Sequence, residues 1–250
     1  MKRTLSLILA ITLIFSCLAC LSSCGKEKMG TGACEYLESR DISGRDIKYV
    51  EICIKDYGKM VVLLDATTAP VTVENFVSLA ESGFYDGLTF HRIIGDFMIQ
   101  GGDPDANGRG GNKDKDGNEI NIKGEFSSNG HQNDISHKYG VISMARSGDP
   151  DSASSQFFIC NADASSSLDG NYAAFGYVVE GLSVIDEVTR DFFPKTDYYE
   201  YYAQYMLTGE PTYYYYWNMY GNGAISDKDD QPVIKYIKVL DSWEKYSWKK

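Results

Sequence analysis

The chain has 250 residues, of which 43% are hydrophobic, and its formal net charge is −11. This length suits one substantial domain with extensions rather than two large domains. After the first three residues the sequence has no lysine- or arginine-rich run of the kind that nucleic-acid binding needs, and its acidity opposes binding to an anionic membrane surface. We therefore expect no nucleic-acid partner, and any membrane attachment must come from something other than charge.

The N-terminal residues predict export. Two basic residues precede an apolar run over residues 5–21, which is short for a membrane span and suits a secretory signal. The run ends in Leu21-Ser22-Ser23-Cys24-Gly25, which resembles the bacterial lipoprotein signature. This resemblance implies that residues 1–23 are a signal peptide and that Cys24 carries lipid, which would anchor the chain to the outer face of the cytoplasmic membrane. The alternatives are an ordinary cleaved signal and an uncleaved anchor.

The remaining cysteines give no sign of redox or metal chemistry. Cys34, Cys53 and Cys160 are left after the signal region, and an odd number does not suggest a disulfide framework. Cys53 and Cys160 fall in apolar, strand-like runs, where a free cysteine behaves as a small buried hydrophobe. His131 and His137 lie in a polar loop without a ligand cluster. We expect no metal and no cofactor.

The pattern of the chain then alternates between short strands and two helices. Residues 24–46 are polar and glycine-containing and predict a flexible tether. A helix is expected from Pro70 to a C-terminal cap at Gly83, and a second helix from Ser183 to about Thr189. The predicted strands are 47–55, 59–65, 89–94, 97–100, 141–144, 156–160, 174–179 and 233–240. Many short strands with only two amphipathic helices favour an antiparallel barrel or sandwich.

Two segments interrupt this pattern and are interpreted as insertions. Residues 112–123 suggest a calcium loop, but Lys123 stands where the twelfth position needs a bidentate glutamate, so we predict a solvated turn. Residues 190–230 are rich in tyrosine and include an aromatic run over residues 213–217. A helix is expected between a possible N-cap at Thr196 and a possible C-cap at Gly209, because four tyrosines recur there at helical spacing: Tyr198, Tyr201, Tyr202 and Tyr205. We expect this insertion to pack on the main domain, with a recognition surface for polypeptide or cell-wall glycan as the alternative.

Three blocks of sequence together resemble the cyclophilin-type peptidyl-prolyl isomerases. The first runs over residues 90–103 as FHRIIGDFMIQGGD, the second combines residues 140–145 (GVISMA) with 155–159 (SQFFI), and the third combines 168–170 (LDG) with 175–176 (FG). The match extends from about Val50 to Leu240. It implies a closed eight-stranded antiparallel barrel capped by two α-helices over residues 47–242, with the tyrosine-rich insertion before the last strand and a C-terminal tail over residues 243–250.

The resemblance also implies an isomerase site for proline-containing polypeptides, in particular unfolded exported proteins. Arg92 would be the cation that stabilises the twisted amide, and of Gln100 and Gln156 one would brace this arginine and the other would bind the substrate backbone. The implied proline pocket consists of Phe97, Met98, Phe158 and Leu168. Ala145, Arg146 and Ser147 would form the edge that binds extended peptide, and Tyr172 stands where many eukaryotic members have histidine.

Other interpretations of the same residues remain open from sequence alone. Phe97, Phe158 and Leu168 suit an ordinary core, and Arg92 suits a surface ion pair with Asp96 or Asp103. A different class of function is a non-catalytic chaperone module that binds polypeptide at the cell surface. A hydrolase would need a serine or cysteine beside a histidine and a carboxylate, which the sequence does not indicate.

Overall fold

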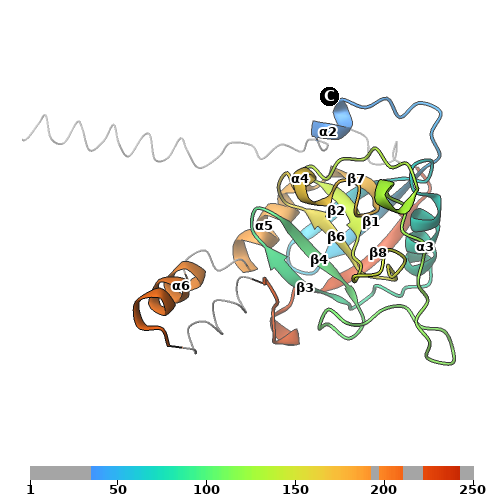
Figure 1. The fold of residues 1–250 in the computed structure, drawn as a ribbon. Coiled ribbons are helices and arrows are strands. Elements are labelled where there is room, and N and C mark those ends of the chain that lie inside the picture. The colour runs from blue at the N-terminus through green and yellow to red at the C-terminus, as the bar shows by residue number, and fades with distance from the viewer. Residues whose placement is uncertain (1–34, 193–196, 211–221, 243–250) are drawn as a thin grey trace, which may run out of the picture. The chain divides into compact units, whose positions relative to one another are not determined.

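The structure is a computed structural model that describes residues 35–192, 197–210 and 222–242. Its strands form one eight-stranded antiparallel sheet in the order β3-β4-β6-β5-β7-β2-β1-β8 (Figure 1). The strands are β1 (Ile47–Ile54), β2 (Gly58–Asp65), β3 (Thr89–Ile94), β4 (Met98–Asp103), β5 (Val141–Met144), β6 (Phe157–Cys160), β7 (Ala174–Glu180) and β8 (Ile234–Leu240). All eight predicted strands are present, with bounds that shift by three residues or fewer.

The sheet curls until its two edge strands meet. An isolated bridge joins Thr89 at the start of β3 to Val233 just before β8, and the Ile234 N–H donates to the Leu88 carbonyl at 2.7 Å. The edges of β3 and β8 therefore touch at one end without forming a full ladder. The predicted eight-stranded antiparallel barrel is confirmed in this curled form.

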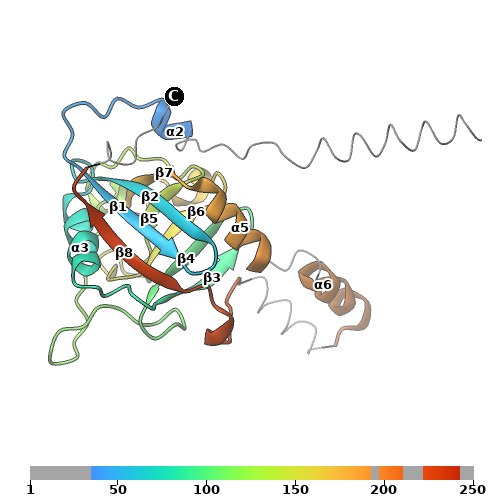
Figure 2. The same cartoon turned by 180° about the vertical axis from the view of Figure 1, so that it is seen from behind.

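Two longer helices lie at opposite ends of the curled sheet (Figures 1 and 2): α3 (Pro70–Glu81) and α5 (Leu182–Phe192). Proline is tolerated in the first turn of α3, and Gly83 follows the helix with φ of +73°, which a glycine adopts without strain. Phe76 of α3 is fully buried and lies 5.3 Å from the ring centroid of Phe157. Both helices predicted for the barrel are confirmed, although α5 begins one residue earlier and ends three residues later.

The other helical segments are short or belong to the insertion. They are α2 (Glu35–Glu38), α4 (Ser165–Leu168), α6 (Asp197–Thr208) and the 3-10 turns η1 (Ser127–Asn129) and η2 (Lys228–Asp230). The tyrosine-rich helix predicted between Thr196 and Gly209 is confirmed as α6. The aromatic run over residues 213–217 lies outside the described residues, and so does Cys34.

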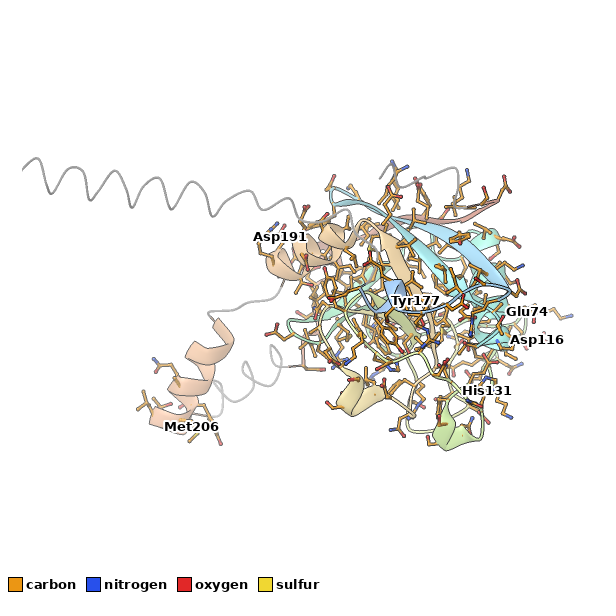
Figure 3. The ribbon with its side chains drawn as sticks, turned by 90° about the horizontal axis from the view of Figure 1, so that it is seen from above. Glu74, Asp116, His131, Tyr177, Asp191 and Met206 are labelled. Carbon is orange, nitrogen blue, oxygen red and sulfur yellow. The ribbon has the colours of Figure 1, made fainter. Side chains whose placement is uncertain are left out.

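Strand β2 carries apolar side chains on both faces, and those on its outer face form a surface on which the N-terminal segment packs. Alternate residues of a strand point to opposite faces, so Met60, Val62 and Leu64 enter the barrel core while Val61 and Leu63 face outward. Figure 3 shows Tyr177 of β7 in the same region as α2. Leu37 of α2 is buried against this outer cluster.

The tether predicted over residues 24–46 is therefore wrong for residues 35–46, which pack on the barrel. Besides Leu37, an ion pair of 2.8 Å joins Arg40 to Asp134, and another of 2.8 Å joins Arg45 to Asp65. An uncovered outer face of β2 and β7 would leave a contiguous apolar patch in water, and this burial removes it. Residues 24–34 lie outside the described part of the chain.

The predicted solvated turn at residues 112–123 is largely exposed. A bridge pairs Lys113 with Glu119, and the Asp114 carboxylate accepts hydrogen bonds from the backbone N–H of Asp116 and Asn118 at 2.8 and 2.9 Å. Asp116 lies at the periphery in Figure 3. Cys53 and Cys160 are buried, as expected. Among the described helices, none is both long and apolar enough to cross a membrane.

Candidate active site

Strand pairing places the main site residues in one row across three strands. Arg92 on β3 is the cross-strand partner of Gln100 on β4, and Gln100 in turn pairs with Phe158 on β6. Directly opposite residues have Cβ atoms about 4.5–5.5 Å apart, so their side chains interact. Residues far apart in the sequence thereby form one continuous surface.

The guanidinium of Arg92 is held from two sides. Its Nη1 donates to Gln100 Oε1 at 3.2 Å, and its Nε donates to the backbone carbonyl of Asn222 at 2.8 Å. Burial lowers the pKa of Arg92 below its usual value, although Tyr172 opposes this shift. The guanidinium remains a cation at neutral pH, because arginine is not deprotonated in proteins. Within the described residues, no carboxylate lies within ion-pair distance of Arg92, which argues against the alternative pairing with Asp96 or Asp103.

Gln100 continues into a short hydrogen-bonded chain. Its Nε2 donates to Gln156 Oε1 at 2.9 Å, and Gln156 Nε2 donates to the Gly110 carbonyl at 2.8 Å. Gln100 is thus the member of the polar pair that contacts the arginine. In the structure the amide of Gln156 is engaged with these two internal partners. Its contact with the substrate backbone stays a prediction.

The apolar residues expected to form a pocket do come together beside this row. Met98, Phe158 and Leu168 are buried in one cluster, with Phe97, Ala145 and Tyr172 packed around it. The Tyr172 ring meets Phe158 edge-on, with ring centroids 6.0 Å apart and an interplanar angle of 81°. Aromatic pairs in this geometry are favourable beyond the area they bury. Arg92 lies at the border of the cluster, because its Nη1 is 4.0 Å from Met98 Sδ.

The segment after β5 forms the adjoining edge. The Ala145 N–H donates to the Gln156 carbonyl at 3.0 Å, and the Ser147 N–H donates to Ser152 Oγ at 2.9 Å. A small polar cavity of about 190 Å³ lies next to this edge. Its lining includes Gln100, Gly110, Ala145, Arg146, Ser154 and Gln156.

Sequence reasoning missed two features of the site. Asn222, at the end of the tyrosine-rich insertion, binds Arg92, and the dipeptide Asn222-Gly223 by itself indicates only a turn. His137 was assigned to a polar loop, yet its side chain is only 1% exposed. Its Nδ1 lies 2.8 Å from Asp169 Oδ1 and its Nε2 lies 2.9 Å from Ser143 Oγ.

This serine, histidine and aspartate arrangement does not make a hydrolase. Ser143 is fully buried in β5, so its hydroxyl cannot reach a substrate. Burial lowers the pKa of His137 and outweighs the opposing effect of its hydrogen bond with Asp169, so the imidazole is neutral at pH 7. Its ring stacks on Phe158 at a centroid distance of 6.0 Å, which makes it a support for the pocket wall. In the described part of the chain, no group of three or more histidine, cysteine, aspartate or glutamate side chains could hold a metal ion.

Relatives of the chain share about half of its length. A peptidyl-prolyl cis-trans isomerase of Schizosaccharomyces pombe is 45% identical over 128 residues, which cover 51% of this chain and 76% of the relative. One of Helicobacter pylori is 44% identical over 124 residues, covering 49% of this chain and 69% of the relative. A putative peptidyl-prolyl cis-trans isomerase of Staphylococcus aureus is 46% identical over 121 residues, covering 48% of this chain and 56% of the relative.

The solved structure of a cyclophilin type peptidyl-prolyl cis-trans isomerase of Cryptosporidium parvum has the same fold. Its TM-score is 0.58 at 24% identity, and the match covers 79% of this chain and 99% of the other. The same protein in the presence of the dipeptide ala-pro gives a TM-score of 0.57 at 25% identity, covering 78% and 99%. The family model for cyclophilin type peptidyl-prolyl cis-trans isomerases matches residues 49–200. With the barrel and the aligned row of site residues, this match shows that the chain belongs to the cyclophilin-type peptidyl-prolyl cis-trans isomerases.

Proposed function

We propose that Arg92 carries the isomerisation by stabilising the twisted amide of an X-Pro bond. Rotation about this bond is slow because amide resonance must be broken, at a cost of about 18–20 kcal/mol. At the twisted geometry the proline nitrogen regains its lone pair and becomes a better hydrogen-bond acceptor. A fixed cation that meets this lone pair binds the transition state more tightly than either planar ground state, which is the condition for catalysis.

The observation that supports this role most directly is the two-sided hold on the guanidinium. Gln100 and the Asn222 carbonyl bind Nη1 and Nε, so the remaining N–H groups keep a defined direction at the border of the apolar cluster. Positioning before the reaction avoids a reorganisation cost during it. If Arg92 and its neighbours lowered the barrier by about 7 kcal/mol, the rate would rise on the order of 10⁵-fold.

The substrate would lie across the row, with the proline ring on the apolar cluster. The apolar surface for this ring would come from Phe97, Met98, Phe158 and Leu168, which also lower the local dielectric beside the cation. The edge at residues 145–147 would take the extended peptide through main-chain hydrogen bonds, which give affinity with little sequence selectivity.

The test uses the chain without residues 1–24 and a short proline peptide whose cis/trans exchange is followed by NMR. Arg92→Ala should lower kcat/KM at least 100-fold, and Arg92→Lys should recover little of it because lysine lacks the planar set of donors. Arg190→Ala is the matched control, since Arg190 is exposed on α5 and contacts only its neighbour Asp191 among the ion pairs of the described residues. Equal rates for the wild type and Arg92→Ala would refute the role of Arg92.

We also propose that the chain works outside the cytoplasm, held to the membrane by lipid on Cys24. The support is the N-terminal sequence, in which the apolar run ends at Leu21-Ser22-Ser23-Cys24. In this setting the substrates would be exported proteins that are still unfolded, for which X-Pro isomerisation is a slow folding step.

The lipid anchor is tested in bacterial cells that express the full chain and are grown with a labelled fatty acid. The wild type and Cys34→Ala should take up label and sediment with membranes, whereas Cys24→Ala should do neither. Cys34 is the matched control because it lies only ten residues further along the sequence. Label retained by Cys24→Ala would contradict the proposal.

A further inference from the structure

The side chain of Arg146 does not extend freely into solvent at the edge of the site. Arg146 lies two residues after the end of β5, where a freely exposed cation would favour acidic peptides. In the structure its Nε donates to the Asn171 carbonyl at 2.9 Å, and its Nη1 donates to the Ser147 carbonyl at 2.8 Å. Two directions of the guanidinium are therefore already fixed by the protein's own backbone.

The same guanidinium also lies over two aromatic rings. Its Cζ lies 4.6 Å from the ring centroid of Tyr172 and 5.2 Å from that of Phe126. Cations within about 6 Å of a ring centroid are attracted by the negative face of the ring. Arginine suits this position better than lysine, because a planar group can stack on two rings and donate in its own plane at the same time.

Two of the segments joined in this way adjoin the proposed proline pocket, because Ala145, next to Arg146, and Tyr172 pack against its apolar cluster. Phe126 is buried in the barrel core, so it is a rigid base for the stack. Asn171 and Tyr172 belong to the turn that follows Leu168, one of the pocket residues. Tyr172 in turn packs edge-on against Phe158. A change at residue 146 would therefore alter the position of the Tyr172 ring at the pocket.

We propose that Arg146 is a positioning residue that fixes the ring of Tyr172 as a wall of the proline pocket. The proposal rests on the proposed function for the location of that pocket. It assigns to the Arg146 side chain an internal task, in which its planar shape matters as much as its charge. The preference for acidic peptides that a freely exposed cation would give is then not expected.

The kinetic test compares Arg146→Lys and Arg146→Gln, each in the wild type and in a Tyr172→Leu background. Both variants should raise KM for a short proline peptide about tenfold and leave kcat nearly unchanged, because a wall that contacts the proline ring in all states contributes uniform binding. In the Tyr172→Leu background the same changes should have little further effect. Arg190→Lys, on the exposed surface of α5, is the control for loss of an arginine.

Two outcomes would overturn the proposal. Wild-type kinetics in Arg146→Lys with a defect in Arg146→Gln would show that charge alone matters. An equal loss with and without the Tyr172 ring would show that Arg146 acts on something else. The ratio of rates for peptides with glutamate and with lysine before the Ala-Pro unit should also stay constant across the variants, and a change confined to the glutamate peptide would contradict an internal role.

An NMR measurement tests the contact between Arg146 and Tyr172 independently of any isomerase activity. In the wild type the Nε–H of Arg146 should give a separate signal that exchanges slowly with water, because it is donated to the Asn171 carbonyl. Tyr172→Leu should move this signal and speed its exchange. An unchanged signal would refute the stacking, whereas an inactive wild type with the expected signal would count against the proposed function alone.

Discussion

Gln100 offers the sharpest test of how Arg92 is held. Its Oε1 is the side-chain acceptor for Arg92 Nη1, at 3.2 Å, while the Asn222 carbonyl holds Nε. Gln100→Ala removes the first hold and leaves the second. Gln100→Glu keeps an acceptor at the same place and adds a full negative charge beside the guanidinium.

The two variants should fail for different reasons. A hydrogen bond to a charged group contributes about 1.5–3 kcal/mol. If about 2 kcal/mol of this is expressed in the transition state, Gln100→Ala should lower kcat on the order of 30-fold. In Gln100→Glu the arginine stays in place, but a carboxylate at this distance offsets much of the field that the cation exerts on the proline nitrogen. We therefore expect a loss of kcat at least as large as that of the alanine variant.

The assay is cis/trans exchange of an Ala-Pro peptide by NMR, with urea unfolding to confirm that each variant is folded. Gln204→Glu on α6 is the matched control for the added charge. Full activity of Gln100→Glu would refute the reasoning, because it would mean that the field of Arg92 at the substrate is not needed. Full activity of Gln100→Ala would refute only the bracing role.

Two further predictions concern stability. Buried Glu125 accepts hydrogen bonds from the backbone N–H groups of Val71 and Thr72 in the first turn of α3, at 3.1 and 2.8 Å. Glu125→Ala should therefore lower the free energy of unfolding in urea by about 2–4 kcal/mol. Glu74→Ala, at an exposed position of the same helix (Figure 3), should lower it by less than about 1 kcal/mol, and equal losses would contradict the capping role. Burial lowers the pKa of both His91 and His137, against the opposing effects of nearby Asp103 and Asp169 respectively. Below the ordinary histidine pKa of 6.5 the unfolded chain therefore binds protons that the folded chain does not, and stability should fall as the pH decreases from 7.5 to 5.5. His137→Gln should flatten this urea-unfolding profile, and an unchanged slope would show that His137 does not contribute.

Much of the barrel could be predicted because its signals are local. The hairpin of β1 and β2 is marked by Asp56-Tyr57-Gly58, and in the structure Asp56 and Gly58 have φ of +67° and +122°. Short strands between such turns, and helix α3 between Pro70 and Gly83, follow from periodicity and from residues that begin or end an element. The resemblance to cyclophilins added which of these strands carry the site.

The predicted tether failed at residues 35–46 because a local pattern does not reveal the surface that a segment will meet. The segment is polar and contains glycine, and three of its residues, Tyr36, Leu37 and Ile42, pack with the outer cluster. Their partners lie on β2 and β7, which come together only when the sheet forms. The need for a cover becomes visible once Val61 and Leu63 are seen to face away from the core.

The sequence by itself determined where strands and helices follow one another along the chain. It also indicated, through the resemblance, which residues could contact a proline ring. The folded chain alone decided which groups hold the cations in place. Arg92 binds a carbonyl 130 residues further along the chain, and Arg146 stacks on rings 20 residues before it and 26 residues after it. Periodicity and turn residues act between near neighbours, whereas the partners of a charged side chain depend on which strands and loops the closed sheet brings side by side.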